Sequence, residues 1–376
     1  MVERVRQTLD PEVEGISTSQ VLTPTEFIID WRASAKKARR RVWLECMNFQ
    51  KGHAPSLVQQ VLFEASDNGL DVRANIDAFS DETFNAMPVW FPTFGKKGEQ
   101  TLRALDRKMK VDLKESKVKV TTVNPDSKRF GLKIPAKIAP FMGRNHVKIY
   151  IIDDVVWFGG INISPEAFEN ADLVVRFEDP EIVKALSELF TQVNENRPTS
   201  DYRKTINSDY TLLVDRGDSG KSLILDEAKE MVSASNEKIE YLSFSPPGGE
   251  MLKEIMERAK NGVRVDIVLS KMSQYESDGS PVGFWLNRKF KKFSEKISRI
   301  ENIYVFHYPE GNVHGKLLIV DGKTALFGSH NFAELGVVFG TQEASIETTD
   351  SSLILQLQQT INSIKDGSFD RGLKRD

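Results

Sequence analysis

The sequence has one cysteine and no long apolar run. Because Cys46 has no second cysteine to pair with, a disulfide within the chain is excluded. No stretch approaches the roughly 18 consecutive apolar residues that a membrane-spanning helix requires. The charged stretch at residues 1–15 also lacks the apolar core of a secretory signal. These absences predict a cytoplasmic protein that can still visit a membrane surface.

An excess of charge of either sign is also missing. The 51 lysines and arginines and the 54 aspartates and glutamates leave a net charge of -3, so no overall positive field attracts nucleic acid. Histidine is scarce, and three of the five histidines, His53, His307 and His330, stand in no spacing typical of metal ligands. We therefore expect no metal or other cofactor, and we interpret these three as ordinary surface or core residues.

The other two histidines open two copies of one motif. The first copy consists of His146-Val147-Lys148, Asp153 and Gly159-Gly160-Ile161-Asn162, and the second of His314-Gly315-Lys316, Asp321 and Gly328-Ser329-His330-Asn331. Each His-x-Lys leads into a short apolar run that ends at an aspartate, which predicts a strand, a tight turn and a second strand. Residues two apart on a strand face the same way. The histidine and lysine of each copy should therefore point to one side.

The sequence around the two motifs is duplicated as well. We expect helices at 23–41, 57–67, 222–234 and 251–260, and strands at 42–49, 70–76, 239–244 and 263–269. Each motif is followed by a further strand and a long helix, at 173–177 and 180–193 and at 344–348 and 351–364. This order predicts βα units on a largely parallel sheet, and the duplication predicts two similar lobes. The predicted boundaries are 1–22 for a lead-in, 23–195 for lobe 1, 196–209 for a linker and 210–376 for lobe 2.

Two histidines and two lysines brought together make a site for a phosphate diester. Lys148 and Lys316 would neutralise the non-bridging oxygens of the phosphate, and Asn162, Asn331 and Ser329 would donate further hydrogen bonds to them. One histidine can attack phosphorus as a neutral imidazole and form a covalent phosphoenzyme. The other can protonate the leaving oxygen and then deprotonate the incoming water or alcohol. This division of the reaction requires no metal.

A nucleophilic histidine also needs a partner on its other ring nitrogen. Two carboxylates stand at comparable places after the motifs, Asp172 in the first half and Glu343 in the second. Each comes just before the strand that follows its motif. By the alternation of side chains along a strand, both can reach a shared site.

With these residues in place, the chain resembles the phospholipase D superfamily, in the form that carries two His-Lys-Asp motifs. A Gly-Gly-x-Asn first copy with a Gly-Ser-x-Asn second copy is similar to the cardiolipin synthase branch in particular. The first copy departs from the pattern in two ways: it is one residue shorter between Asp153 and Gly159, and it has Gly160 where the second copy has Ser329.

The resemblance implies an α/β fold of two αβαβα-layered lobes related by a pseudo-twofold axis, with the active site at their interface. It further implies that each histidine is oriented by the carboxylate of the opposite half, Glu343 for His146 and Asp172 for His314. The motif aspartates, Asp153 and Asp321, are implied to be mainly structural. By analogy with the family, we favour His146 as the nucleophile.

Two aromatic-rich stretches, Phe84–Phe94 and Val282–Phe293, occupy matching places in the two halves. A third patch, Phe130–Phe141, also combines aromatic with basic residues. The second carries Arg288, Lys289, Lys291 and Lys292, and the third carries Lys133 and Lys137. Such a composition suits a lipid-water interface and predicts peripheral contact with a membrane through 84–94 and 282–293. The alternative is that the aromatic rings pack inward and the lysines are simply solvated.

Three functions are left open by the sequence. The first is a phospholipase D or phosphatidyltransferase, which moves a phosphatidyl group to water or to an alcohol such as a second phosphatidylglycerol. The second is a metal-independent nuclease of the same superfamily, which the lack of a basic excess disfavours. The third is a scaffold that binds a lipid surface without turnover.

Overall fold

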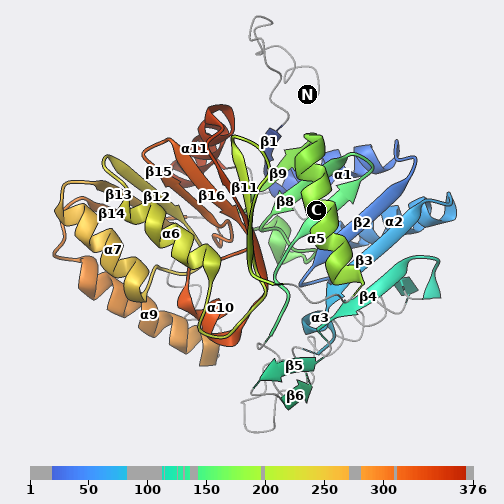
Figure 1. Cartoon of the computed structure of the whole chain (residues 1–376), viewed down its shortest axis with the longest axis horizontal. Helices are drawn as coiled ribbons and strands as arrows, with labels where there is room; N and C mark the ends of the chain where they lie inside the picture. Colours follow the sequence, from blue (N-terminus) through green and yellow to red (C-terminus); the bar gives the residue numbers. More distant parts are fainter. Residues whose placement is uncertain are drawn as a thin grey trace, which may run out of the picture.

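The chain forms two lobes that lie side by side, as the computed structural model shows (Figure 1). The structure describes residues 19–82, 112–113, 115–124, 126–129, 132–135, 143–195, 200–270, 281–308 and 311–369. Each lobe has its own sheet, and helices cover the outer faces of both sheets. No helix of these residues is long and apolar enough to cross a membrane.

The sheet of lobe 1 is mixed rather than largely parallel. Its strands lie in the order β1 (Ser19–Leu22), β9 (Val174–Phe177), β8 (Val155–Gly159), β7 (Ile149–Ile152), β2 (Arg41–Cys46), β3 (Asp71–Asp77) and β4 (Lys119–Val123). The pairs β2–β3 and β3–β4 are parallel, whereas the motif hairpin β7–β8 and its flanking pairs are antiparallel. The prediction of a largely parallel sheet is therefore wrong, because a tight turn reverses the chain and only a crossover gives a parallel neighbour.

The sheet of lobe 2 repeats this order. Its strands are β10 (Tyr202–Thr205), β11 (Tyr210–Asp215), β17 (Glu343–Thr348), β16 (Thr324–Gly328), β15 (Leu317–Val320), β12 (Lys238–Leu242), β13 (Arg264–Leu269) and β14 (Ile303–His307). The run from β17 to β14 matches the run from β9 to β4 strand for strand, including the two parallel pairs. The duplication seen in the sequence is therefore a duplication of the fold.

The helices repeat as well. Lobe 1 has α1 (Pro24–Ala35), α2 (His53–Asp67) and α5 (Pro180–Asn194), which correspond to α6 (Leu223–Ser233), α7 (Gly249–Lys260) and α11 (Ser351–Asp366) of lobe 2. The remaining described elements are α3 (Phe79–Glu82), η2 (Glu166–Phe168), α9 (Pro281–Ile297), α10 (Glu334–Phe339) and the hairpin of β5 (Asp126–Arg129) and β6 (Leu132–Pro135).

The first helix illustrates how local signals set one boundary and distant contacts set the other. It begins as predicted, with a capping box between Thr23 and Glu26 and a proline in the first turn. It ends at Ala35, earlier than the predicted 41. The backbone N–H groups of residues 39–41 instead donate hydrogen bonds to Asp153, on the motif hairpin. That contact lies far along the sequence and cannot be inferred from helix signals.

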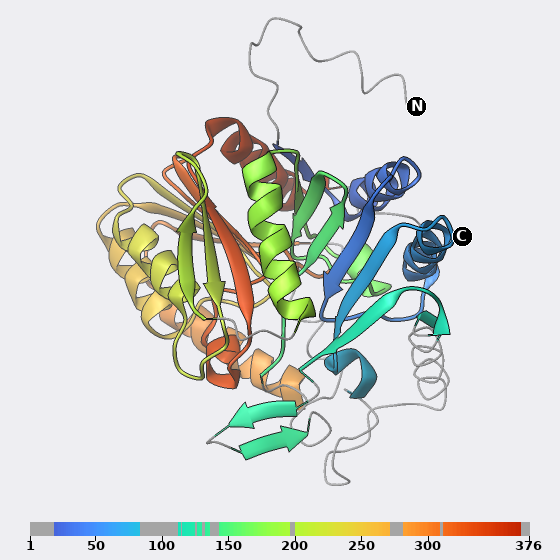
Figure 2. The ribbon, with the colours of Figure 1, turned by 45° about the vertical axis from the view of Figure 1, so that its right-hand side comes forward.

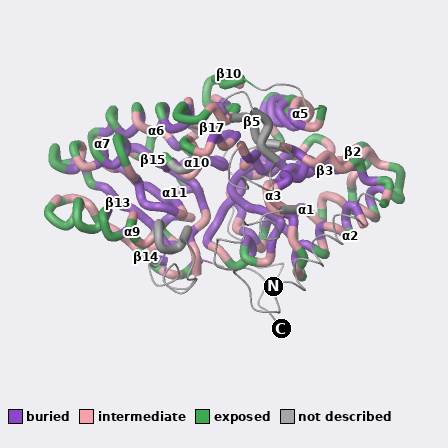
Figure 3. The backbone as a smooth tube through the Cα atoms, turned by 90° about the horizontal axis from the view of Figure 1, so that it is seen from below, coloured by how far each residue is buried: buried purple, intermediate pink, exposed green. Residues whose placement is uncertain are grey.

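One apolar core extends from lobe to lobe. Helix α5 lies between the two sheets (Figure 2), and its buried residues share a cluster with those of α11 and with strands of both sheets. The rings of Phe177 and Phe327, from opposite lobes, stack with centroids 6.4 Å apart. Burial is continuous where the lobes meet, whereas α7 and α9 expose much of their surface at one end of the molecule (Figure 3). The interface is therefore a packed core, which fixes the position of one lobe on the other.

Two strands lie outside the lobes that the sequence predicted. β1 falls within the expected lead-in, yet it pairs antiparallel with β9. β10 falls within the expected linker, yet it pairs with β11 at the edge of the second sheet. Lobe 1 therefore includes residues 19–22, and lobe 2 includes residues 202–205. The rest of the proposed division stays a proposal.

Candidate active site

An isolated β-bridge joins the two lobes beside the first histidine. Asn145 pairs with Gln342 of lobe 2, and the His146 amide donates a hydrogen bond of 2.8 Å to the Gln342 carbonyl oxygen. The next residue, Glu343, directs its carboxylate at His146, whose Nδ1 lies 3.1 and 3.0 Å from the two carboxylate oxygens. The two side chains are nearly enclosed, at 12% and 4% exposure.

A matching bridge joins the lobes beside the second histidine. Ala171 of lobe 1 pairs with Val313, and the His314 amide donates to the Ala171 carbonyl oxygen at 2.8 Å. Asp172 then places Oδ2 2.6 Å from His314 Nδ1. The structure therefore brings each of the two predicted carboxylates to the histidine of the opposite half.

Both motif lysines are buried next to their histidines. Lys148 Nζ donates to the carbonyl oxygen of His146, and Lys316 Nζ donates to that of His314. Burial lowers the pKa of both lysines, that of Lys316 to about 8, and the charge of Lys316 lowers the pKa of Lys148 further. Two ammonium groups in a poorly hydrated site interact strongly with any anion that enters it. The pair is therefore suited to hold a phosphate group.

The two imidazoles belong to the same electrostatic unit. Burial lowers the pKa of both, and the charges of Lys148 and Lys316 act in the same direction. The pKa of His314 falls to about 4, and the charge of His314 also lowers the pKa of His146. The resting imidazoles are therefore neutral near pH 7. Because each Nδ1 is directed at a carboxylate, the proton resides there and Nε2 keeps its lone pair.

The two carboxylates differ in their surroundings. Burial would raise the pKa of Asp172, but its contact with His314 and the charge of Lys316 lower it, whereas burial raises the pKa of Glu343. Ser329 Oγ donates to Glu343 at 2.5 Å and accepts from the Ala344 amide at 3.0 Å. The sequence predicted that Ser329 donates to the phosphate. Its hydroxyl faces Glu343, and contact of Ser329 with a substrate phosphate stays a prediction.

The first motif copy has Gly160 in the place of Ser329, and the structure gives the reason. A Cβ atom at Gly160 would lie 2.4 Å from Asp172 Oδ1, well inside van der Waals contact. The carboxylate of Asp172 therefore occupies the space that a side chain would need. The two half-sites thus use different combinations, glycine with aspartate and serine with glutamate.

The motif aspartates lie at the hairpin turns and bond to backbone. Asp153 accepts hydrogen bonds from the amides of residues 39, 40 and 41 at 2.8 to 3.0 Å. Asp321 accepts from the amides of residues 236, 237 and 238 at 2.8 to 2.9 Å. Each aspartate ties its hairpin to the start of the neighbouring strand, β2 or β12. This geometry supports the structural role that the resemblance implies.

The motif asparagines follow β8 and β16. Asn162 Oδ1 accepts from the Asn48 amide at 3.3 Å, and the backbone carbonyl of Asn331 accepts from Ser243 Oγ at 2.8 Å. Within the described residues, the buried Oδ1 of Asn331 has no hydrogen-bond partner. Contact of either side chain with a substrate phosphate stays a prediction.

The other three histidines do not belong to the pair of His-x-Lys motifs. His53 and His307 are exposed. His330 is buried in lobe 2, where its Nδ1 accepts from the Phe332 amide at 2.9 Å. Across the described residues, no group of three or more His, Cys, Asp or Glu side chains could hold a metal ion.

The three aromatic and basic stretches are described to different extents by the structure. Residues 282–293 belong to helix α9, where Phe290 and Phe293 pack in the core of lobe 2 while Arg288, Lys291 and Lys292 are exposed. The stretch 84–94 lies outside the described residues. Of 130–141, the structure describes only strand β6.

Sequence reasoning missed a set of buried polar residues behind His146, namely Glu45, Asn75, Asp77, Arg144 and Asn145. The available signal was a polar residue inside an apolar strand. Glu45 interrupts β2, and its counterpart in the second half is the apolar Leu242, as the matching strand registers show. Comparison of the two halves position by position would have singled out Glu45, Asn75 and Asn145, whose counterparts are apolar.

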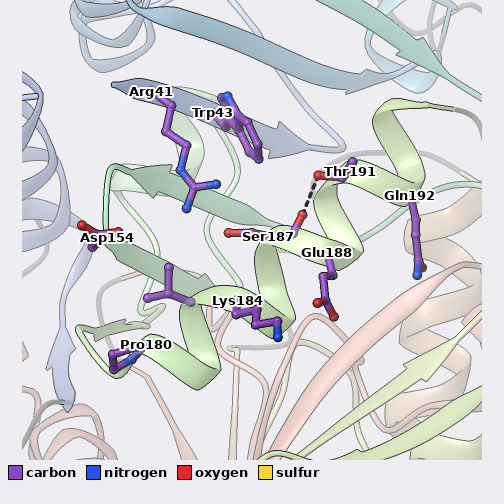
Figure 4. A pocket seen from close by; sticks show the side chains of 10 residues that line it. Arg41, Trp43, Asp154, Pro180, Lys184, Ser187, Glu188, Thr191 and Gln192 are labelled. Atoms are coloured by element: carbon purple, nitrogen blue, oxygen red, sulfur yellow. Dashed lines mark hydrogen bonds between the residues drawn. The ribbon is translucent and has the colours of Figure 1, made fainter. Parts of the chain in front are cut away.

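A surface groove of about 740 Å³ lies in lobe 1 between β2 and α5 (Figure 4). Trp43 and Arg41 form one wall, and Ser187 and Glu188 of α5 form the other. The guanidinium of Arg41 lies 4.5 Å from the centroid of the Trp43 ring. None of the candidate site residues lines this groove, so we assign it no part in the chemistry.

Two duplicated lobes, each lending a carboxylate to the His-x-Lys motif of the other, define a phospholipase D-like protein. The family described as "Cardiolipin synthase, PLD-like domain" matches residues 32–194 and 228–365, which together make up most of the chain. The chain belongs to this family, in the cardiolipin synthase branch of the superfamily.

Individual relatives are distant. A cardiolipin synthase of Staphylococcus aureus (strain Mu50 / ATCC 700699) is 26% identical over 222 residues, which cover 54% of this chain and 43% of that protein. Cardiolipin synthase A of Buchnera aphidicola subsp. Schizaphis graminum is 22% identical over 316 residues, which cover 78% of this chain and 58% of that protein. The chain thus spans only about half the length of these curated relatives.

Among solved structures, the phosphatidylserine synthase of Haemophilus influenzae Rd KW20 has the same fold. It superposes with a TM-score of 0.67 at 14% identity, covering 93% of this chain and 86% of that one. The polyphosphate kinase of Porphyromonas gingivalis superposes with a TM-score of 0.52 at 12% identity, covering 94% of this chain and 50% of that one. At such identities the likeness is one of fold, and the duplicated phospholipase D-like architecture is common to nearly the whole chain.

Proposed function

We propose that this protein is a phosphatidyltransferase or phospholipase D that cleaves a phospholipid phosphodiester through a covalent phosphohistidine. One observation carries the proposal: each imidazole has Nδ1 held by a carboxylate of the other lobe, beside two buried lysines. The cardiolipin synthases among its relatives support a phospholipid substrate.

In the first step, Nε2 of His146 attacks phosphorus while the bond from phosphorus to the leaving oxygen breaks. His314 delivers a proton from Nε2 to that oxygen, so the head-group alcohol departs neutral. Lys148 and Lys316 offset the charge of the non-bridging oxygens. The anion also opposes the effect that lowers the pKa of His314, so binding of the substrate favours the protonated, acidic form of that histidine.

In the second step, the hydroxyl of an acceptor attacks the phosphorus of the phosphohistidine. His314, now neutral, takes the proton of that hydroxyl, and the bond between phosphorus and His146 Nε2 breaks. An alcohol acceptor gives a new phosphodiester, and water gives phosphatidic acid. Glu343 and Asp172 hold the two rings in the required tautomer throughout.

Contact with the lipid surface is proposed for the exposed face of α9. Arg288, Lys291 and Lys292 are exposed there while Phe290 and Phe293 anchor the helix in the core. This supports an electrostatic contact with anionic lipid head groups, on the order of 1 kcal/mol for each basic side chain near the surface. It does not support insertion of those two rings into the bilayer.

The direct test is to incubate purified protein with phosphatidylglycerol vesicles and identify the lipid products by mass spectrometry. Release of glycerol with formation of a diphosphatidyl product supports the transferase, and phosphatidic acid supports the hydrolase. Protein denatured rapidly at neutral pH, where the P–N bond survives, should carry a phosphatidyl group on the His146 peptide. Cleavage of labelled single-stranded DNA with no lipid turnover would replace the proposal by a nuclease, and vesicle binding without turnover would replace it by a scaffold.

A further inference from the structure

The segment that carries His146 is fixed by buried polar side chains, and two of them, Glu45 and Asn145, have apolar counterparts in lobe 2. A third, Asp77, corresponds to the buried Ser270, whose hydroxyl likewise accepts from the Val313 amide at 2.8 Å. Asn145 Nδ2 donates to Glu45 Oε1 at 2.8 Å, and Asn145 Oδ1 accepts from the Val147 amide at 2.9 Å. The Asn145 amide donates to Asp77 Oδ2 at 2.7 Å. Asn145, which precedes His146, therefore fixes the backbone of Val147, which follows it, and Asn145 is itself bound by the carboxylates of Glu45 and Asp77.

Glu45 is itself fully enclosed, at 1% exposure. Its second oxygen accepts from Asn75 Nδ2 at 2.9 Å, and Asn75 Oδ1 accepts from Asn194 of α5 at 2.8 Å. The charged groups around Glu45 are Asp77 on β3 and, paired with Asp77, the buried Arg144 just before Asn145. Helix α5 faces this network with the Phe190 carbonyl and the Asn194 amide.

The positions of Glu45, Asn75 and Asn145 are apolar in lobe 2. The strand registers match Glu45 with Leu242 and Asn75 with Val268, and the two bridges match Asn145 with Val313. All three counterparts, Leu242, Val268 and Val313, pack in the core between the lobes. Since the fold is built with hydrocarbon at this place in one lobe, it does not need a buried carboxylate there in the other.

We propose that Glu45, acting through Asn145, is a positioning residue for His146, and that its ionisation sets how firmly that imidazole is held against Glu343. This inference rests on the proposed function, in which His146 is the nucleophile. Both neighbouring amides present N–H donors to Glu45, so the ionised carboxylate, which only accepts, suits them better than the acid does.

The protonation state of Glu45 is set by its surroundings. Burial raises its pKa to about 7, the charge of Asp77 adds to this, and the hydrogen bonds from Asn75 and Asn145 oppose it. As the pH rises through this value, Glu45 loses its proton, and each of its carboxylate oxygens accepts more strongly from the side-chain amide that faces it, Asn75 or Asn145. Turnover should therefore rise with pH in the same range.

Two variants test the assignment, Glu45→Gln and the triple Glu45→Leu/Asn75→Val/Asn145→Val, which copies the residues of lobe 2. We expect kcat to fall about tenfold with KM nearly unchanged, a range that displacement of a reacting group by a fraction of an ångström can produce. The rise of kcat with pH near 7 should also disappear. The matched control is Asp266→Asn, which removes a buried carboxylate that is paired with Lys365 in lobe 2; it should keep the wild-type pH profile.

A second readout does not depend on turnover. The ring resonances of His146, assigned by their absence from His146→Ala, should shift with a midpoint near pH 7 in the wild type, although the imidazole itself titrates far lower. That midpoint should vanish in Glu45→Gln. If both variants keep the wild-type kcat and pH profile and the resonance midpoint persists, Glu45 is structural only and the inference is overturned. If the wild type lacks lipid turnover while the midpoint vanishes in the variant, the positioning contact stands and the proposed function fails.

Discussion

The two lobes have the same backbone but different side chains behind their histidines. Both turn aspartates make three backbone bonds, and both bridges set a histidine against a carboxylate. Behind His146, however, lies the polar set around Glu45, whereas behind His314 lie Leu242 and its apolar neighbours. The contacts that hold the fold are repeated, and those nearest the reacting nitrogen have diverged. A site built from two equivalent halves has in this way become a site with two unequal histidines.

Removing either imidazole should have the largest effect on turnover of all the substitutions considered. We expect His146→Ala and His314→Ala each to lower kcat by at least about 1000-fold with phosphatidylglycerol, because neither ring can take the role of the other. A substrate with a p-nitrophenolate leaving group, which needs no proton, should restore the first step to the His314 variant alone, as a burst of one p-nitrophenolate per site, while turnover stays slow because the second step still lacks its base. Rates are measured on vesicles at equal protein concentration. A His314 variant with the wild-type rate on the natural lipid would refute the acid and base assignment.

The next largest effect should come from forcing the first half-site to resemble the second. In Gly160→Ser the new Cβ would lie 2.4 Å from Asp172 Oδ1, so the carboxylate must move away from His314. We expect kcat to fall about 100-fold, the loss that a displacement near 1 Å can cause. Gly160→Ala should behave alike, because the clash arises from Cβ. Steady-state kinetics at several pH values measure this, and an unchanged kcat would show that Asp172 does not orient His314.

The turn aspartates test a feature in which the two lobes should be equal, namely the stability that each aspartate contributes. Asp153→Asn and Asp321→Asn should each lower the stability by about 2 kcal/mol, because the amide is uncharged and has one acceptor oxygen in place of two, so exposed and partly buried backbone N–H groups lose their bonds to a carboxylate. The two losses should agree within about 1 kcal/mol, as measured by urea unfolding at pH 7. Lipid turnover per folded molecule should be unchanged.

The pH dependence of that loss follows from the direction of the pKa shifts. The backbone N–H bonds lower the pKa of Asp153 and Asp321 although burial would raise it. A carboxyl whose pKa is lowered by folding contributes stability above its unfolded pKa of about 4, and that contribution is lost as the pH falls through the folded value. The gap between wild type and either variant should therefore close in acid. A gap that widened in acid would contradict the assigned contacts.

Much of the architecture could be predicted from sequence because its signals are local and occur twice. The hairpin dipeptides, the Thr23 cap and the Asn-Gly helix ends each specify a nearby backbone conformation, and the element order repeats between the halves. The largely parallel sheet was predicted wrongly because helix and strand order alone does not give the direction of every pair. The end of α1 was missed because Asp153, far along the chain, takes the amides that a longer helix would use.

The candidate site also contains residues that could be predicted from the sequence and residues that could not. The His-x-Lys pairs and the two carboxylates could be named, because each stands at a fixed place relative to a duplicated motif. The support of Glu343 by Ser329 and the exclusion of a side chain at Gly160 could not be named, because both depend on distances across adjacent strands. Glu45 was missed for a different reason: a single glutamate in an apolar strand is a weak signal until its counterpart Leu242 is set beside it.

The smallest effect distinguishes two roles for one hydroxyl. Ser329→Ala removes the hydrogen bond to Glu343, and we expect kcat to fall severalfold, about 1 kcal/mol, with little change in KM. Loss of a donor to the carboxylate should also raise the pKa of Glu343 and shift the acid limb of the pH profile upward. If Ser329 instead bonds to the substrate phosphate, KM should rise and the acid limb should stay in place. Steady-state kinetics from pH 5 to 9 separate these outcomes, and Ser329→Thr, which keeps the hydroxyl, is the matched control.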